Sequence, residues 1–202
     1  MKKLFTMLTL VAISTTLSFA QQGSVAIGVG SNLANVSWQD YSLTPTVGYF
    51  ITENMMVGTG FSMGSSSEED AFDPNSGEIG DQDMSSFSMS PFFRYYMNDA
   101  FFASVGIAIT SSTNKWDLSD AFGVPVTSES TISTFGLNAG VGYSLMWNDR
   151  ICIEPSLGIA TSSGSSSSKV NFDGTVTEVD TDAPSTFGMA IGLGIHIRLG
   201  GK

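Results

Sequence analysis

The closing stretch of the chain, FGMAIGLGIHIRLGGK at residues 187–202, decides the fold class. Large apolar residues occupy every odd position from Phe187 to Leu199. Small residues fill most of the even positions, joined there by His196 and Arg198. This strict two-residue period predicts a β-strand with one large apolar face and one face made mostly of small side chains.

The same alternation recurs in earlier segments, at residues 25–29, 41–49, 57–63, 87–95, 101–109, 135–145 and 151–159. Most of these segments approach the roughly 9–11 residues that a tilted strand needs to cross a bilayer. The prediction is an all-β fold, an eight-stranded antiparallel up-and-down transmembrane β-barrel. Pro45, Pro91 and Pro155 lie on the apolar face of these strands and mark candidate bulges.

Short and long connections alternate between the predicted strands. Short turns fall at 51–54, 98–99 and 148–150, and long polar segments at 31–40, 64–85, 112–131 and 162–185. Bacterial outer-membrane barrels have short periplasmic turns and long extracellular loops. We therefore expect an outer-membrane location with extracellular loops and, because the strand number is even, both mature termini in the periplasm.

Composition separates a membrane barrel from the alternative, a secreted soluble barrel of the lipocalin kind. Only 13% of the residues are charged, against about 25% in an ordinary soluble protein. The polar strand face consists of Gly, Ala, Ser and Thr, which suit the crowded interior of an eight-stranded barrel. The large apolar face is then predicted to meet lipid.

Aromatic residues gather beside the short turns, as an interfacial girdle at headgroup level requires. The predicted girdle consists of Tyr49, Phe50, Tyr95, Phe101, Tyr143 and Trp147.

The first residues have the features of a secretory signal peptide. Lys2 and Lys3 precede an apolar run at 4–13, and small residues stand at Ser18 and Ala20. We expect a signal peptide over 1–20 and one barrel domain over 21–202. The net charge of −11 argues against nucleic-acid binding, and the single cysteine excludes an internal disulfide.

The hairpin LTPTVGYFITENMMVGTGFSM at 43–63, with the signal peptide and the alternating segments, resembles small outer-membrane β-barrels of the OmpA and OmpX type, in the form found in Bacteroidetes-like bacteria. The resemblance covers 21–202 and implies the barrel fold. It also implies a structural protein, an adhesin, a narrow channel or, more rarely, a lipid-modifying enzyme.

Four ionisable residues have inward parity on the predicted strands: Arg94, Glu154, His196 and Arg198. An unpaired charge in a narrow lumen is costly, so these groups should pair. We expect Glu154 to accept bonds from Arg94 or Arg198 with His196 nearby, in a lumen also filled by Phe92, Tyr96 and Phe102. The alternative is a catalytic or gating role for the same residues.

The enzymatic interpretation of the resemblance is a lipid A deacylase-like barrel, which uses a histidine, a serine and an acidic residue and whose histidine should project outward to lipid. His196 has inward parity, and Arg198 rather than a serine stands two residues later. We therefore expect no enzymatic activity, no catalytic residues and no cofactor.

Most of the 19 acidic residues fall in the long polar segments, beside only two basic ones, Lys115 and Lys169. Clustered carboxylates suit Ca²⁺, but the ligand spacing of a calcium loop is missing, so solvated acidic loops without assigned metal ligands are expected, and binding of divalent cations is the alternative. The run SSGSSSSK at 162–169 is expected to be a flexible loop.

The expected function is a structural or surface-interaction role for a monomer with acidic extracellular loops and a plugged lumen. The alternatives are a narrow porin-like channel for small solutes and, less favoured, a lipid-modifying enzyme. Expected partners are outer-membrane lipid, lipopolysaccharide and the barrel-assembly machinery.

Overall fold

The computed structural model describes residues 22–32, 44–74, 76–97, 100–148 and 150–200. The predicted signal peptide and most of the segment 31–40 lie outside these residues. The strands are β1 (Val25–Asn32), β2 (Thr44–Phe50), β3 (Met55–Phe72), β4 (Ile79–Tyr96), β5 (Phe101–Asp117), β6 (Val126–Tyr143), β7 (Leu145–Trp147), β8 (Ile151–Phe172) and β9 (Thr175–Leu199).

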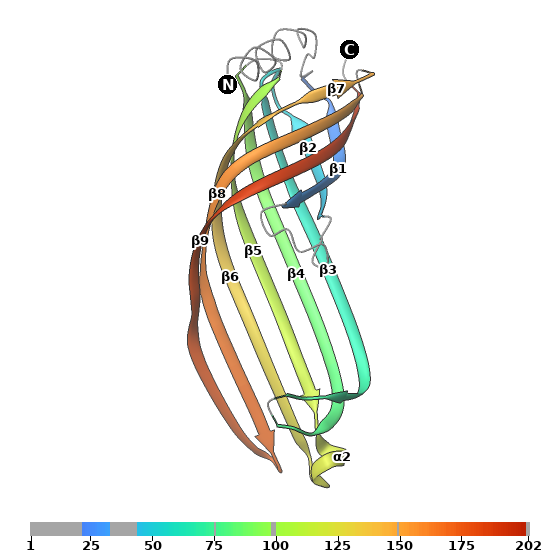
Figure 1. Ribbon diagram of the computed structural model, residues 1–202, viewed down its shortest axis with the longest axis vertical. Helices are drawn as coiled ribbons and strands as arrows, with labels where there is room; N and C mark the ends of the chain where they lie inside the picture. Colours follow the sequence, from blue (N-terminus) through green and yellow to red (C-terminus); the bar gives the residue numbers. More distant parts are fainter. Residues whose placement is uncertain (1–21, 33–43, 75, 98–99, 149, 201–202) are drawn as a thin grey trace, which may run out of the picture.

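These strands close into an antiparallel barrel (Figure 1). Consecutive strands pair from β1 to β6, β6 pairs with β8, and β9 pairs with both β8 and β1. The short β7 follows β6 after Ser144 and also pairs with β8, so β6 and β7 share one place in the barrel. The predicted all-β, eight-stranded antiparallel barrel is confirmed.

The strands are much longer than predicted. Each of β3, β4, β5, β6, β8 and β9 has between 17 and 25 residues. Most of the segments 64–85, 112–131 and 162–185 therefore continue as strands, and the prediction that they are long loops is wrong. The serine run at 162–169 lies inside β8.

Shorter connections replace three of the expected loops. Asp173 and Gly174, between β8 and β9, have φ values of 47° and 83°. Positive φ at both central residues is the requirement of a type I′ hairpin turn. The two long strands are thus joined directly. Between β5 and β6 stands the short helix α2 (Ser119–Phe122), where the Ser119 amide and hydroxyl bind Asp117 and lower the pKa of its carboxyl.

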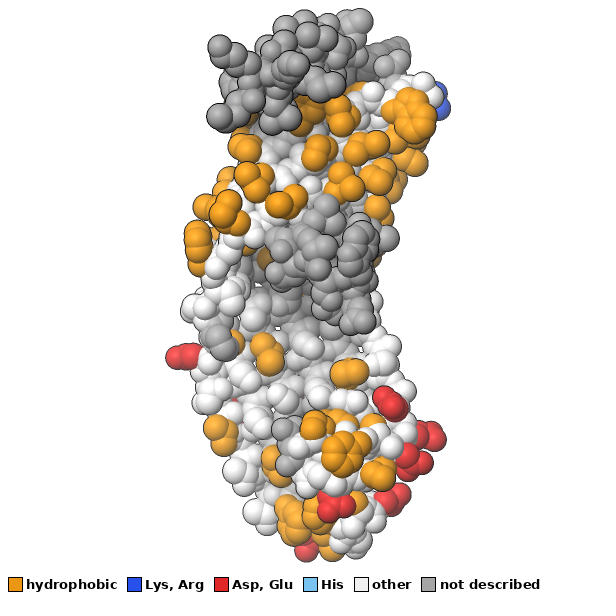
Figure 2. Space-filling model, viewed as in Figure 1, with side chains coloured by type: hydrophobic (Ala, Val, Ile, Leu, Met, Phe, Trp, Pro, Cys, Tyr) orange, Lys and Arg blue, Asp and Glu red, His pale blue; other side chains and the backbone are white. Residues whose placement is uncertain are grey.

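The outward face changes from apolar to polar along the long strands. On β5 the outward residues run apolar to Ile109 and then change to Ser111 and Thr113. On β6 they are apolar from Tyr143 back to Phe135, and then polar from Ser133. Figure 2 shows many apolar side chains over the half of the molecule nearer the short turns, and a further, smaller group near the far end. This apolar band is the part of the barrel that meets lipid.

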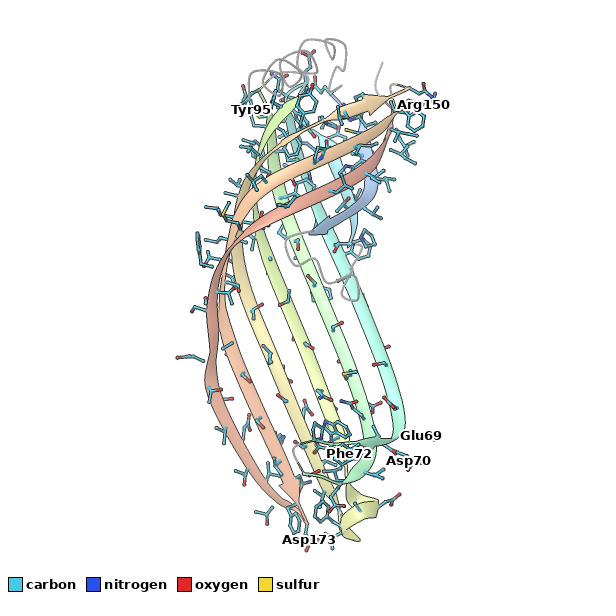
Figure 3. All side chains as sticks on the ribbon, viewed as in Figure 1. Glu69, Asp70, Phe72, Tyr95, Arg150 and Asp173 are labelled. Atoms are coloured by element: carbon cyan, nitrogen blue, oxygen red, sulfur yellow. The ribbon has the colours of Figure 1, made fainter. Side chains whose placement is uncertain are left out.

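Beyond the band, six strands continue with mostly polar residues on both faces, although Ala71, Trp116, Leu118 and Val126 form a small buried apolar cluster toward the far end. We call this part the distal extension: residues 64–72, 79–86, 110–117, 126–134, 162–172 and 175–186. A sheet whose two faces are mostly polar belongs in water rather than in hydrocarbon. Figure 3 shows Tyr95 and Arg150 at the short-turn end, and Glu69, Asp70, Phe72 and Asp173 at the far end of the extension.

The distal extension is an open sheet rather than a closed barrel. β9 pairs with β1 only from Gly192 to Leu199, and β3 pairs with β2 only from Met56 to Gly60. Beyond these positions, no strand among the described residues pairs with the outer edge of β3 or of β9. The two strands form opposite margins of the extension in Figure 1.

Irregularities in pairing fall elsewhere than predicted. The register shifts between Glu68 and Ala71 of β3 and at Ser162/Gly164 of β8. None of Pro45, Pro91 and Pro155 marks a register shift; pairing between β4 and β5 is merely interrupted beside Pro91.

No helix in the part of the chain that the structure covers has the length and apolarity needed to span a membrane.

Candidate functional site

The lumen is filled at its short-turn end. Five buried residues form one cluster, with Phe92 packed against it: Ala26, Phe50, Met56, Tyr96 and Phe102. The rings of Phe50 and Phe102 each lie 5.5 Å from that of Tyr96, centroid to centroid. We call this cluster, together with the charged groups described next, the lumen plug.

Glu154 is the centre of the polar part of the plug. Its carboxylate is buried and forms an ion pair with Arg94 through Oε2. Its Oε1 accepts hydrogen bonds from Ser144 Oγ at 2.7 Å, Tyr96 OH at 3.2 Å and the Cys152 thiol at 3.4 Å. A buried carboxylate is stable only with such a set of donors and a counter-ion.

Arg94 is held between aromatic rings as well as by its ion pair. Its guanidinium carbon lies 4.7 Å from the ring centroid of Phe92 and 4.8 Å from that of Phe102. Both distances are within the range of a cation–π interaction. The planar guanidinium thus bridges the carboxylate and the aromatic filling of the lumen.

Arg198 does not bond to Glu154, although the sequence left it open as a partner. Its guanidinium carbon lies 4.9 Å from the Phe50 centroid and 5.8 Å from the Tyr96 centroid, and its Nη2 is 3.9 Å from Cys152 Sγ. Arg94, on β4, forms the ion pair with Glu154 instead.

His196 faces the lumen and is buried. Its Nδ1 lies 3.2 Å from Glu154 Oε2, but neither ring nitrogen has a hydrogen bond with the geometry of a good one among the described residues. Two glycines make room for the ring: a Cβ at Gly28 would lie 2.7 Å from Cδ2, and one at Gly194 would lie 2.8 Å from Cε1. The structure therefore brings Arg94, Glu154 and His196 together and places Arg198 beside them.

Sequence reasoning missed two members of this network, Ser144 and Cys152. The Ser144 hydroxyl lies 2.9 Å from Cys152 Sγ and donates to Glu154. Both residues have the same inward parity as Glu154, and this parity was the signal that could have identified them.

The predicted aromatic girdle needs one correction. Tyr49, Tyr95, Phe101 and Trp147 are exposed at the short-turn end, and Tyr143 packs edge-on against Phe101 with centroids 4.8 Å apart. Phe50 is wrong as a girdle residue, because it has inward parity and 0% exposure in the lumen plug.

A second girdle of aromatic residues marks the other margin of the apolar band. Four phenylalanines are exposed there, just before the outward face becomes polar: Phe61, Phe87, Phe135 and Phe187. A barrel that spans a bilayer is expected to have two such girdles, one at each membrane interface. Within the described residues, no group of three or more His, Cys, Asp and Glu side chains could hold a metal ion.

Comparison with solved structures finds resemblance at low sequence identity. The chain resembles Ail, the attachment invasion locus protein of Yersinia pestis, with 14% identity and a TM-score of 0.45. It also resembles a major outer membrane protein from Thermus thermophilus, with 10% identity and a TM-score of 0.49. Each comparison covers 88% of this chain and 99% of the other. No curated protein matches the sequence.

A family model matches nearly the whole chain. The autotransporter β-domain matches residues 18–201, nearly the whole chain, whereas the 43–63 hairpin suggested the OmpA and OmpX type. With its lipid-facing band and closed antiparallel barrel, the chain is an outer-membrane β-barrel protein that belongs to the autotransporter β-domain family.

Proposed function

We propose that this protein is a non-conducting, non-enzymatic anchor that carries a surface-interaction sheet, the distal extension, on the outside of the cell. One observation carries the proposal: the six long strands continue far beyond the apolar band with mostly polar side chains on both faces. A barrel that served only to span the membrane would need no strand residues beyond the girdle formed by Phe61, Phe87, Phe135 and Phe187.

The lumen plug argues against the alternative, a narrow channel. Phe50, Met56, Tyr96 and Phe102 have at most 2% exposure, and an ion pair lies among them. Solutes that pass through a barrel require a continuous polar path, as in porins. The plug instead resembles a core, in which paired charges and aromatic rings stabilise the barrel.

The same geometry argues against lipid-modifying activity. His196 is 4% exposed, faces the lumen and has Gly28 and Cys152 as its cross-strand neighbours. A catalytic histidine must reach its substrate within hydrogen-bond distance, directly or through one water. Lipid outside the barrel cannot approach this ring.

The proposed orientation places the short turns and both termini in the periplasm. Val25 near the start of the described chain pairs with Leu199 near its end, at the short-turn end. The tyrosines and Trp147 would lie at the periplasmic headgroups, and the acidic extension would lie outside. The barrel would be a monomer inserted by the barrel-assembly machinery and surrounded by outer-membrane lipid and lipopolysaccharide.

Labelling with a membrane-impermeant maleimide on intact cells tests this arrangement. The only native cysteine, Cys152, is fully buried, so the unmodified protein gives the background. Ser165→Cys in the distal extension should label on intact cells. Glu53→Cys in a short turn is the matched control, and it should label only after the outer membrane is permeabilised.

The reverse pattern, with Glu53→Cys labelled on intact cells and Ser165→Cys protected, would overturn the proposed orientation. Labelling of Cys152 itself in the folded protein would show that the plug opens, and would count against the closed lumen.

A further inference from the structure

The outer edge of β9 carries backbone groups without a strand partner. From Thr175 to Ala183, β9 pairs with β8 on one side, and no strand among the described residues pairs with it on the other. In an antiparallel strand, alternate residues direct both N–H and C=O away from the paired neighbour. Such an edge is a template for one more strand.

A row of charges crosses the outer face of the extension and ends at this edge. Its members are successive cross-strand partners on β4, β5, β6, β8 and β9: Asp83, Lys115, Glu129, Lys169 and Glu178. Lys115 Nζ lies 3.2 Å from Glu129 Oε2. The sign alternates at every strand, so opposite charges face each other at each step. The row ends on an acid, where the next strand would present a base.

The edge strand repeats this acidic character along its length. Glu178, Asp180 and Asp182 stand at alternate positions and therefore point to the same, outer face. Lys169 on β8 stands opposite Glu178, whereas Asp180 and Asp182 stand opposite the uncharged Ser167 and Ser165. The inner-face residues between the acids are Val179 and Thr181. Along this edge, acidic residues on the outer face therefore alternate with β-branched residues on the inner face.

We infer that the edge of β9 from Thr175 to Ala183 binds an extended polypeptide segment by strand addition, and that the segment carries Lys or Arg at alternate positions. Main-chain hydrogen bonds to the edge would supply part of the affinity, and alternate side chains would supply the specificity. Basic side chains would face the three carboxylates, and β-branched residues between them would continue the inner face.

A second copy of this chain does not fit the same edge. Two β9 edges placed together would set Glu178, Asp180 and Asp182 against like charges, which is destabilising in cross-strand pairs. The free edge of β3 offers Ser65 and Ser67 on its outer face, and β3 contains no basic residue. The partner must therefore bring its own positive charge.

Titration of the purified full-length protein in detergent micelles with synthetic peptides tests the inference. One peptide alternates Lys with Val or Thr, and a control peptide of the same composition groups its lysines in one block. The alternating peptide should bind about tenfold more tightly, the difference expected from three favourable cross-strand charge pairs. Hydrogen exchange should show new protection at 175–183.

Charge reversal supplies the matched variant. The triple variant Glu178→Lys, Asp180→Lys and Asp182→Lys should lose the preference for the lysine peptide and bind an alternating glutamate peptide instead. Equal affinity for the alternating and block peptides would show only undirected charge attraction and would overturn the inference. Protection at the β3 edge instead, or unchanged preference in the reversed variant, would overturn it too.

The inference rests on the proposed function only in placing the extension in water. Failure of the peptide titration would leave the cysteine labelling pattern unaffected, so the two proposals fail separately.

Discussion

Arg94 on β4 and Glu154 on β8 are 60 residues apart in the chain and form an ion pair inside the barrel. Neither strand pairs with the other, so the bond crosses the lumen rather than following the sheet. It ties separate walls of the barrel together beside the buried aromatic cluster, where Arg94 lies over the rings of Phe92 and Phe102. The plug is thus a stabilising core built from both charge and packing.

Removing one partner of this pair should destabilise the barrel strongly. Glu154→Gln keeps the shape of the side chain but leaves the buried Arg94 without its counter-ion, which typically costs about 3–5 kcal/mol of unfolding free energy. Urea unfolding in micelles, followed by the gel mobility of folded barrel, measures the change.

The double variant Arg94→Met with Glu154→Leu is the control for this prediction. Because it removes both charges, its loss of stability should be clearly smaller than that of Glu154→Gln. A double variant that is as unstable as the sum of its single changes would argue against coupling of the two residues.

Two adjacent aromatic residues should respond very differently to truncation. Phe50→Ala empties a fully buried site in the plug and should cost about 3–5 kcal/mol. Tyr49→Ala removes a half-exposed ring at the membrane margin and should cost markedly less. The same urea unfolding measures both, and a larger loss for Tyr49→Ala would contradict the assignment of Phe50 to the lumen.

Close approach of Ile195 and His196 leaves no room for a Cβ at Gly28. A Cβ at Gly28 would lie 2.0 Å from the backbone oxygen of Ile195, whereas at Gly30 the nearest atom, Thr46 Cγ2, is 3.9 Å away. Gly28→Ala should cost about 1–3 kcal/mol or prevent folding, and Gly30→Ala should be tolerated. If the two variants had equal folded yields, the packing described around His196 would be incorrect.

The boundary between lipid and water can be tested on one strand. Leu157 and Ser165 both point outward from β8, the first in the apolar band and the second in the distal extension. Leu157→Arg in lipid vesicles should cost about 2–4 kcal/mol, the depth-dependent cost of a charge facing lipid. Ser165→Arg should change stability little, and a comparable loss there would place the extension in the membrane.

Alternation predicted the strands of the membrane band because lipid imposes one apolar face. From Phe101 to Ile109 every odd residue is apolar or small and every even residue but Phe102 is small, and the structure keeps this parity. The strands of the distal extension were not predicted, because water meets both of their faces and imposes no apolar face. Between Ser162 and Ser168 both faces meet water, so no hydrophobic period distinguishes strand from loop.

The inward set of residues followed from parity, but the bonds within it did not. Arg94, Glu154, His196 and Arg198 were all identified as inward, and the structure places them in one plug. Which arginine reaches Glu154 depends on the curvature of the closed barrel, which brings β4 across from β8. Phe50 was misassigned because its place beside a short turn outweighed its parity.

Conductance across a planar lipid bilayer tests the central claim, a barrel closed by its own side chains, most directly. Purified protein, shown to be folded by heat-modifiable gel mobility, should insert without producing steady unitary currents, while an open porin gives them in the same bilayer. Reproducible unitary currents whose size changes on substitution of Arg94 would contradict the claim, because they would place a conducting path through the plug.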